Sequence, residues 1–403
     1  MAKIFYTDIS ELVTNAGVKE KNGKNITESD LRIIQNAALL WDDKKGIVWF
    51  GPKKERTAKK DEKKVSLDGR VLTPALVDCH THLVHGGSRH DEFQMRLEGK
   101  SYQEIAQSGG GIQNSVGATR LLSKNDLVKK ACVDIEKIKA LGVGILEIKS
   151  GYGLNLETEI KQLEAIQALK NKYKKEIVIQ STFLGAHANA SDAYTNEIVN
   201  KMLPVVAKKN LADACDAFFD EGYFNRAQTK KILEKAKTLG LKLKLHADEL
   251  ADTGGASLAA ELKVLSADHL LKANLGNLKL MAKNDVVAVL LPTTAFYLGL
   301  PYADLKKMRQ AQVCMALASD YNPGSSPTFH MPFVMSLSVL SMGMTLPEAF
   351  AAATFGGAKA LGLQETHGHL EIGKKPKMAI FDIPSYKCLI QQVANPSLCS
   401  MLI

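Results

Sequence analysis

The sequence lacks the features that mark membrane and secreted proteins. It has no run of 18 or more apolar residues, so a membrane-spanning helix is not expected. Met1 to Thr7 is followed directly by mixed polar sequence, so we expect no signal peptide and a cytoplasmic location. The 45% apolar and 24% charged fractions are those of an ordinary globular protein.

Regularly spaced cysteines and a basic aromatic patch are also missing. The six cysteines are scattered without a CxxC pair, which favours reduced thiols over a disulfide framework. The net charge is +9, but the densest lysine run, residues 52–64, is mixed with acids and has no aromatic residues between them. We therefore expect a solvated loop there, and neither a nucleic acid nor a membrane as partner.

Both ends of the chain differ in pattern from its middle. Short apolar stretches broken by turn residues fill residues 1–73 and 365–403, without helical periodicity. Residues 367–383, "HGHLEIGKKPKMAIFDI", predict two short strands around a Gly-Lys turn. We expect the two ends to pair as one small β domain.

Residues 74–364 alternate short apolar runs with amphipathic stretches, which indicates parallel β/α units. Helices are expected at "NDLVKKACVDIEKIKALG", "ETEIKQLEAIQALKNKY" and "AQTKKILEKAKTLG", which carry apolar residues at three- and four-residue steps. The predicted strands are 75–82, 144–152, 176–187, 216–222, 242–249, 265–270, 286–294 and 315–322. Eight such units predict a (β/α)8 barrel, because a doubly wound open sheet gives no reason for this count.

Metal-ligating residues stand at the ends of several predicted strands, where barrel enzymes place their active sites. His80 and His82 are two residues apart, so on a strand both imidazoles face the same side. With His246 and Asp320 they would give three nitrogens and one oxygen, a set suited to one Zn²⁺ or Fe²⁺ ion per subunit. The sequence does not choose between these metals.

Other strand-end residues have both functional and structural interpretations. Glu249 follows His246 by three residues and suits proton transfer near a metal, but it could equally be a loop acid or assist the helix beginning near Gly255. His187 and His269 also stand at strand ends, although a lone histidine there is more often structural. Only their convergence with the other histidines favours function.

Several longer motifs carry a resemblance to a known family. They are "HTHLVHGGSR", "EIKSGYGLNLETE", "TFLGAHA", "HADE", "SADHL", "VLLPTTAF" and "SDYNPGSSPT". Together they resemble the amidohydrolase superfamily, and within it the imidazolonepropionase family, over nearly the whole chain. The resemblance implies an amidohydrolase-type barrel beside a β-sandwich, and metal binding by His80, His82, His246 and Asp320.

The same resemblance implies roles for further residues. Glu249 and His269 would be catalytic, as acid/base and as the group that polarises a carbonyl. The implied substrate contacts are Arg89, Tyr152, His187, Glu249, Asn322, Gly324 and Ser325. The implied reaction is hydrolysis, by a metal-activated water, of the cyclic amide C–N bond in 4-imidazolone-5-propanoate to N-formimidoyl-L-glutamate, a step of histidine degradation.

Two other functions stay open at the level of sequence. A deaminase acting on cytosine, guanine or a related heterocycle shares the metal frame and the Glu three residues after the strand-five His, although Arg89 and "SGYG" suit a substrate with a carboxylate tail. A non-catalytic barrel would be expected to lose ligands, and here none is lost. A homodimer is the default expectation for the assembly.

Overall fold

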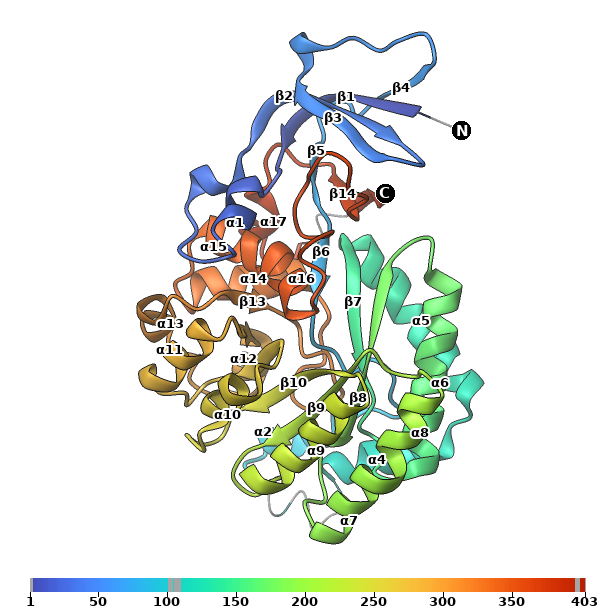
Figure 1. Cartoon of the computed structure of the whole chain (residues 1–403), viewed down its shortest axis with the longest axis vertical. Helices are drawn as coiled ribbons and strands as arrows, with labels where there is room; N and C mark the ends of the chain where they lie inside the picture. Colours follow the sequence, from blue (N-terminus) through green and yellow to red (C-terminus); the bar gives the residue numbers. More distant parts are fainter. Residues whose placement is uncertain (1–2, 101–103, 105–109, 396–398, 403) are drawn as a thin grey trace.

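The structure is a computed structural model that describes residues 3–100, 104, 110–395 and 399–402. Two sheets organise this part of the chain, as Figure 1 shows. One contains eight strands and forms the barrel, and the other contains seven strands and lies at one end of the molecule, near both chain termini. No helix in the described ranges is long and apolar enough to cross a membrane.

Eight parallel strands form the barrel in chain order, which confirms the predicted architecture. They are β6 (Leu76–Asp78), β7 (Val143–Lys149), β8 (Val178–Ala186), β9 (Ala214–Phe219), β10 (Lys242–Ala247), β11 (Ser266–His269), β12 (Val287–Leu290) and β13 (Met315–Leu317). The first and last strands meet just beyond their ends, where Thr81 bridges Tyr321. This contact closes the barrel.

Helices follow most of the strands and cover the barrel from outside (Figure 1). The three expected from periodicity are α5 (Lys124–Ala140), α6 (Leu156–Tyr173) and α9 (Arg226–Thr238). The other helices after barrel strands are α2 (His90–Leu97), α4 (Ile112–Leu121), α7 (Asp192–Glu197), α8 (Leu203–Lys208), α10 (Gly255–Leu262), α11 (Leu275–Lys283), α12 (Pro292–Leu298), α13 (Leu305–Ala311), α14 (Met331–Leu340), α15 (Leu346–Ala351) and α16 (Gly357–Ala360). Gly142 and Gly240 follow α5 and α9 with φ of +86° and +84°, as glycines after helices do.

Both ends of the chain contribute to the second sheet, as the sequence predicted. Its strands are β1 (Lys3–Leu12), β2 (Ile34–Asp42), β3 (Gly46–Pro52), β4 (Glu62–Ser66), β5 (Val71–Pro74), β14 (Met378–Phe381) and β15 (Cys399–Leu402). The short helices α1 (Ala16–Glu20) and α17 (Cys388–Gln391) accompany them. β14 pairs antiparallel with β5, which joins the two ends directly. The domain boundaries at residues 73 and 365 stay predictions.

Several strand predictions need correction. The strands predicted at 286–294 and 315–322 end early, at Leu290 and Leu317. The first barrel strand ends at Asp78, so His80 and His82 lie in an extended segment beyond it and not on the strand. Residues 367–372 form no strand. Their backbone makes isolated hydrogen bonds instead of a ladder along one neighbouring strand: Leu370 N–H donates to the Thr14 carbonyl, and Gly373 N–H donates to the Ile47 carbonyl. The Gly-Lys turn is therefore flanked by a strand on one side only.

Candidate metal centre and substrate cavity

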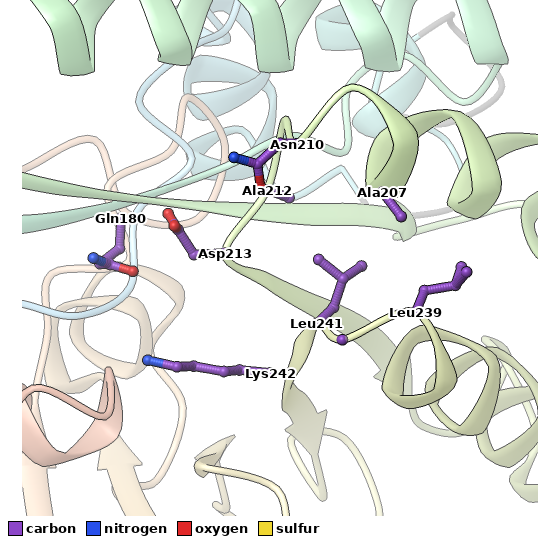
Figure 2. A pocket seen from close by; sticks show the side chains of 9 residues that line it. Gln180, Ala207, Asn210, Ala212, Asp213, Leu239, Leu241 and Lys242 are labelled. Atoms are coloured by element: carbon purple, nitrogen blue, oxygen red, sulfur yellow. The ribbon is translucent and has the colours of Figure 1, made fainter.

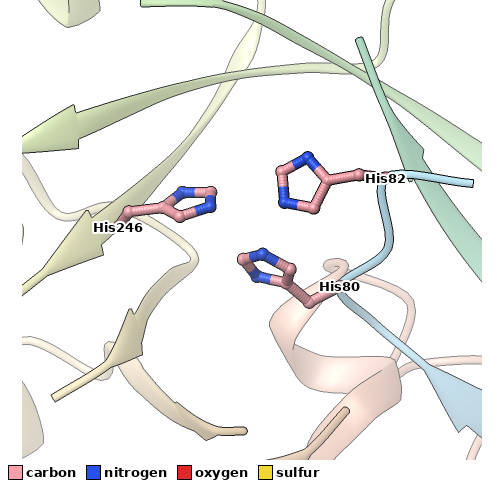
Figure 3. Close-up of side chains that lie close together, drawn as sticks. All are labelled: His80, His82 and His246. Atoms are coloured by element: carbon pink, nitrogen blue, oxygen red, sulfur yellow. The ribbon is translucent and has the colours of Figure 1, made fainter. Parts of the chain in front are cut away.

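Three buried histidines meet at the carboxyl ends of the barrel strands (Figure 3). His80 and His82 come from the segment after β6, and His246 comes from β10. One ring nitrogen from each lies within 4.8 Å of the others. Backbone bonds fix the segment after β6, because Asp320 N–H donates to His80 and His82 N–H donates to Tyr321. The side chains of His80 and His82 therefore both point toward His246, although the two residues lie beyond the end of β6.

Asp320 completes the group from the segment after β13. Its Oδ1 lies 3.4 Å from Nε2 of His80 and 3.4 Å from Nε2 of His82. Its Oδ2 accepts a hydrogen bond of 2.7 Å from Thr294, so the carboxylate is held with one oxygen toward the histidines. Burial opposes ionisation, but the facing imidazoles of His80 and His82 hold the pKa of Asp320 well below its usual range.

Carboxylates lie behind two of the histidines, with a hydrogen bond to His80 and an ion-pair contact to His246. Nδ1 of His80 lies 2.6 Å from Oδ2 of Asp268, and Nδ1 of His246 lies 3.1 Å from Oδ2 of Asp216. A carboxylate on one ring nitrogen is the usual support of a histidine that binds metal through the other. Neither acid was predicted from the sequence, although Asp268 stands directly before His269 in "SADH".

The donor set fits a divalent metal ion. Nε2 of His80 and Nε2 of His246 are buried and make no hydrogen bond to any described residue. Such orphaned atoms are costly in a protein interior unless a ligand satisfies them. Burial and Lys149 oppose a proton on His80, yet Asp268 and Asp320 raise the pKa of His80 to about 9, so the site attracts a cation. Three imidazoles and a carboxylate suit Zn²⁺ or Fe²⁺.

Glu249 and His269 lie beside this centre. Oε1 of Glu249 is 3.5 Å from Nδ1 of His269, and both side chains are almost fully buried. Burial raises the pKa of Glu249 and lowers the pKa of His269, so each favours its neutral form more than in water. The backbone of His269 has a φ of +78°, a strained value for a residue with a Cβ, which is common at functional sites.

A cavity of about 730 Å³ opens above the histidines. All the expected metal, catalytic and substrate-contact residues line it except His80, which is fully buried below. The cavity is also lined by residues that were not predicted from the sequence, among them Glu92, Phe93 and Arg96 on α2, and Phe218 and Tyr223. Helical periodicity of the "RHDEFQMR" stretch could have indicated the first three.

Arg89 is fixed in the cavity wall. Its guanidinium donates to Oε2 of Glu92 through Nε at 2.8 Å and pairs with it through Nη2 at 2.7 Å. Nη1 packs on Gly324, where a Cβ would stand only 1.8 Å from it. Gly324 is therefore required for this arrangement, which leaves Nη1 available to a ligand. Arg89 is not a free cation, because Glu92 balances its charge.

Two aromatic rings face the metal group from the other side. The His187 ring stacks on His82 with centroids 5.0 Å apart, and Nδ1 of His187 lies 2.9 Å from the Gly151 carbonyl. Burial lowers the pKa of His187 well below its usual range, so this ring is neutral. Tyr152 is buried with its ring 5.4 Å from His187 and 5.9 Å from His82. These rings form an apolar wall with polar edges.

Asn322, Gly324 and Ser325 form a tight loop at the cavity edge. Oδ1 of Asn322 accepts the backbone N–H groups of Gly324 at 2.9 Å and Ser325 at 2.8 Å, and its Nδ2 donates to the Asp320 carbonyl at 2.6 Å. The Asn322 amide thus shapes the loop that carries Asp320. His85, the third histidine of "HTHLVHGGSR", is buried away from the metal group, with Nε2 3.3 Å from Nζ of Lys130.

A second cavity of about 340 Å³ lies at the amino ends of β8, β9 and β10 (Figure 2). Its two charged side chains already have partners. Asp213 pairs with Lys170 at 2.7 Å and accepts from Ser181, and Nζ of Lys242 lies 3.4 Å from the Leu361 carbonyl. It has no convergent group of orphaned atoms, so the functional site is the one at the opposite end of the barrel.

A parallel eight-stranded barrel with a metal-ligating group and a buried acid at its mouth defines a metal-dependent hydrolase. Comparison with known proteins gives the family. The model of the amidohydrolase family matches residues 71–399, and the chain belongs to this family and to the imidazolonepropionases within it.

The imidazolonepropionase of Geobacillus kaustophilus is 43% identical over 403 residues, covering 96% of this chain and 93% of the relative. That of Alkaliphilus oremlandii is 42% identical over 392 residues, covering 95% and 92%. The structure of an adenosine deaminase from Xanthomonas campestris with bound zinc is similar with a TM-score of 0.70 and 17% identity, covering 100% of this chain and 91% of the other. At this identity the structural likeness shows the fold alone.

Proposed function

We propose that this chain hydrolyses the cyclic amide C–N bond of 4-imidazolone-5-propanoate to N-formimidoyl-L-glutamate. The observation that carries the proposal is one cavity that holds the three-histidine group, the buried Glu249 and the fixed guanidinium of Arg89. The substrate has matching parts: a carboxylate tail, a planar ring and a carbonyl beside a ring nitrogen. The names of the relatives support the same reaction.

One group of residues binds the substrate, and a second group transfers protons. Arg89 binds the propionate through Nη1 by a charge-assisted hydrogen bond, which anchors the substrate. Tyr152 and His187 pack against the imidazolone ring and orient it toward the metal ligands. Asn322, Gly324 and Ser325 close the same side and contact the opened product.

Hydrolysis needs a proton to move from water to the leaving ring nitrogen. We assign this transfer to Glu249. Burial raises the pKa of its carboxyl group, which suits it to accept a proton from water and then to donate it to the ring nitrogen. His269, neutral beside it, donates a hydrogen bond to the carbonyl oxygen as negative charge develops there. The water oxygen joins the carbonyl carbon, the C–N bond breaks, and the ring nitrogen leaves with the proton that Glu249 delivers. The carbonyl carbon becomes the new carboxyl group, which releases the second water proton to solvent as it ionises.

A divalent ion held by His80, His82, His246 and Asp320 would lower the pKa of water and polarise the carbonyl. Zn²⁺ and Fe²⁺ both fit this donor set, so we propose either as cofactor. We also propose a homodimer in the cytoplasm, with the small molecule as its only substrate class; all six cysteines are free, as in a reducing compartment.

The decisive test is turnover of freshly prepared 4-imidazolone-5-propanoate by Zn²⁺-loaded protein, followed by loss of ultraviolet absorbance. We expect turnover by the wild type, and a loss on the order of 10²-fold or more in Glu249→Gln with metal content unchanged. Cytosine and guanine serve as control substrates. Release of ammonia from either, with no reaction of the imidazolone, would contradict the proposal and favour a deaminase.

A further inference from the structure

Two lysines lie inside the barrel beneath the metal centre. Lys149 on β7 and Lys244 on β10 are 0% and 1% exposed. Burying an ammonium group costs several kcal/mol unless close partners repay it. Lys149 and Lys244 share one such partner, because their Nζ atoms lie 2.9 Å and 3.0 Å from Oε2 of Glu147. These three residues form a connected layer of charge inside the barrel.

This charged layer reaches both histidines that carboxylates support. Nζ of Lys149 lies 2.7 Å from Oδ2 of Asp216, the same oxygen that faces Nδ1 of His246. Oδ2 of Asp268, which faces Nδ1 of His80, lies 3.8 Å from Lys149 and 3.7 Å from Lys244. Each lysine is thus one carboxylate away from a metal ligand.

Buried carboxylates outnumber buried ammonium groups in this region. The carboxylates are Glu147, Asp216, Asp268 and Asp320, and the ammonium groups are those of Lys149 and Lys244. The excess of negative charge favours a cation at the histidines, which a divalent ion or protons on the imidazoles can supply. Without Lys149, Oδ2 of Asp216 would lose its 2.7 Å partner and could turn from His246 toward other donors.

We propose that Lys149, and to a smaller degree Lys244, are positioning residues for the metal centre. Lys149 holds Asp216, both lysines hold Asp268, and the two carboxylates hold the imidazoles of His246 and His80 with Nε2 toward the metal. The inference rests on the proposed metal-dependent function. It assigns a role in metal binding to two lysines for which none was predicted from the sequence.

The test compares three lysine-to-methionine variants, each of which removes one buried ammonium group. Lys149→Met and Lys244→Met disrupt the charged layer. Lys359→Met is the matched control, because Lys359 is 4% exposed and pairs with Asp285 at 2.7 Å at the amino end of the barrel, away from the histidines. Affinity for Zn²⁺ alone is measured by competition with a chelator, together with Tm and the visible spectrum of the Co²⁺ form.

We expect Lys149→Met to lower Zn²⁺ affinity about 10- to 100-fold and to change the Co²⁺ spectrum, as loss of a partner behind a ligand does. Lys244→Met should lower affinity less, because it contacts Asp268 only at longer range. Lys359→Met should lower Tm without changing affinity. Wild-type affinity in Lys149→Met, or equal losses in all three variants, would overturn the proposal.

Folding failures are also informative. If Lys149→Met does not fold, Lys244→Met decides by the same readouts. If neither folds while Lys359→Met does, the lysines are needed for the barrel itself and the proposal is wrong. Because the assay reads binding of Zn²⁺, it is independent of turnover: wild type that binds Zn²⁺ but leaves the imidazolone unreacted would contradict the proposed function only.

Discussion

Single side chains at the barrel mouth owe their chemistry to burial. Glu249 is the clearest case, because burial raises its pKa and the carboxylates of Asp320 and Asp220 add to the shift, while His269 opposes it. A buried carboxyl with a raised pKa exchanges protons more readily near neutral pH than an exposed one. The same burial keeps His187 and His269 neutral, so that they can donate and accept hydrogen bonds.

The raised pKa of Glu249 predicts the acid side of the pH profile. Glu249 must be a carboxylate to accept a proton from water, so kcat/KM falls as pH decreases through its pKa. Because that pKa is raised, we expect the fall at a higher pH than the ordinary pKa of a glutamate. The profile is measured with Zn²⁺-loaded protein and with metal content determined at each pH. A fall at the ordinary value, with metal retained, would contradict the assignment.

Some residues of the candidate site could be predicted from the sequence and others could not. His80, His82, His246 and Asp320 were predictable because they stand where strands end. Asp216 and Lys149 were not, because a buried strand hides which of its polar residues are paired. One signal was present: Lys244 and His246 are two residues apart on a strand, as are Glu147 and Lys149, so each pair faces the same side.

At the scale of elements, the loop after β10 is held by the end of β9. The Asp220 carboxylate accepts backbone N–H groups from Glu249 at 2.7 Å, Leu250 at 2.9 Å and Ala251 at 3.1 Å. Asp248, with a φ of +51°, turns the chain, and its side chain accepts N–H groups at the start of α10. The position of Glu249 therefore depends on two acids that touch no substrate.

We expect Asp220→Asn to lower kcat on the order of 10-fold with unchanged Zn²⁺ affinity. The amide keeps only one acceptor oxygen, and its NH2 group faces the N–H groups that the other carboxylate oxygen accepts. If Oδ2 is the oxygen replaced, the N–H groups of Glu249 and Leu250 lose their partner and Glu249 shifts, and small shifts of a catalytic group are costly. Asp252→Asn is the control, because this exposed acid of the same loop pairs only with the Asn274 side chain among the contacts described. Wild-type kcat in Asp220→Asn would show that the loop is held by other contacts.

The predicted and observed elements differ where tertiary contacts, and not the local sequence pattern, determine where a strand forms or ends. Periodicity located α5, α6 and α9 and all eight barrel strands, because amphipathic and apolar patterns are local properties. It extended the first strand to His82, since the apolar run hides the end of ladder pairing at Asp78. It also placed a strand at 367–372, where the available partners are isolated carbonyls and not a sheet edge.

At the scale of the molecule, the two sheets meet through the first barrel strand. β5 belongs to the terminal sheet and leads through Ala75 into β6, so the terminal domain is continuous with the barrel. Phe381 of β14 packs on Gly142 just before β7, where any Cβ would be 2.2 Å from its ring. The terminal sheet thus lies at the amino end of the barrel (Figure 1). The cavity with the histidines lies at the carboxyl end.

The metal centre joins distant parts of the barrel, which predicts that metal removal destabilises the whole molecule. The proposed ligands come from the segments after β6 and β13 and from β10, so one ion would link the first, fifth and last strands. An ion that binds only the folded state at 100 times its Kd adds about 2.7 kcal/mol of stability. In a domain of this size that corresponds to a shift of Tm on the order of 5 °C.

Calorimetry compares the Tm of Zn²⁺-loaded protein with the Tm of protein from which the metal has been removed by a chelator and dialysis. We expect Tm to fall by several degrees and to return on addition of Zn²⁺. Ca²⁺ is the control ion and should not restore it, because Ca²⁺ prefers six or more oxygen ligands and the site offers three imidazole nitrogens. Equal Tm values with and without Zn²⁺ would mean that the excess negative charge inside the barrel is neutralised by protons, and that the histidine group holds no ion in the folded protein.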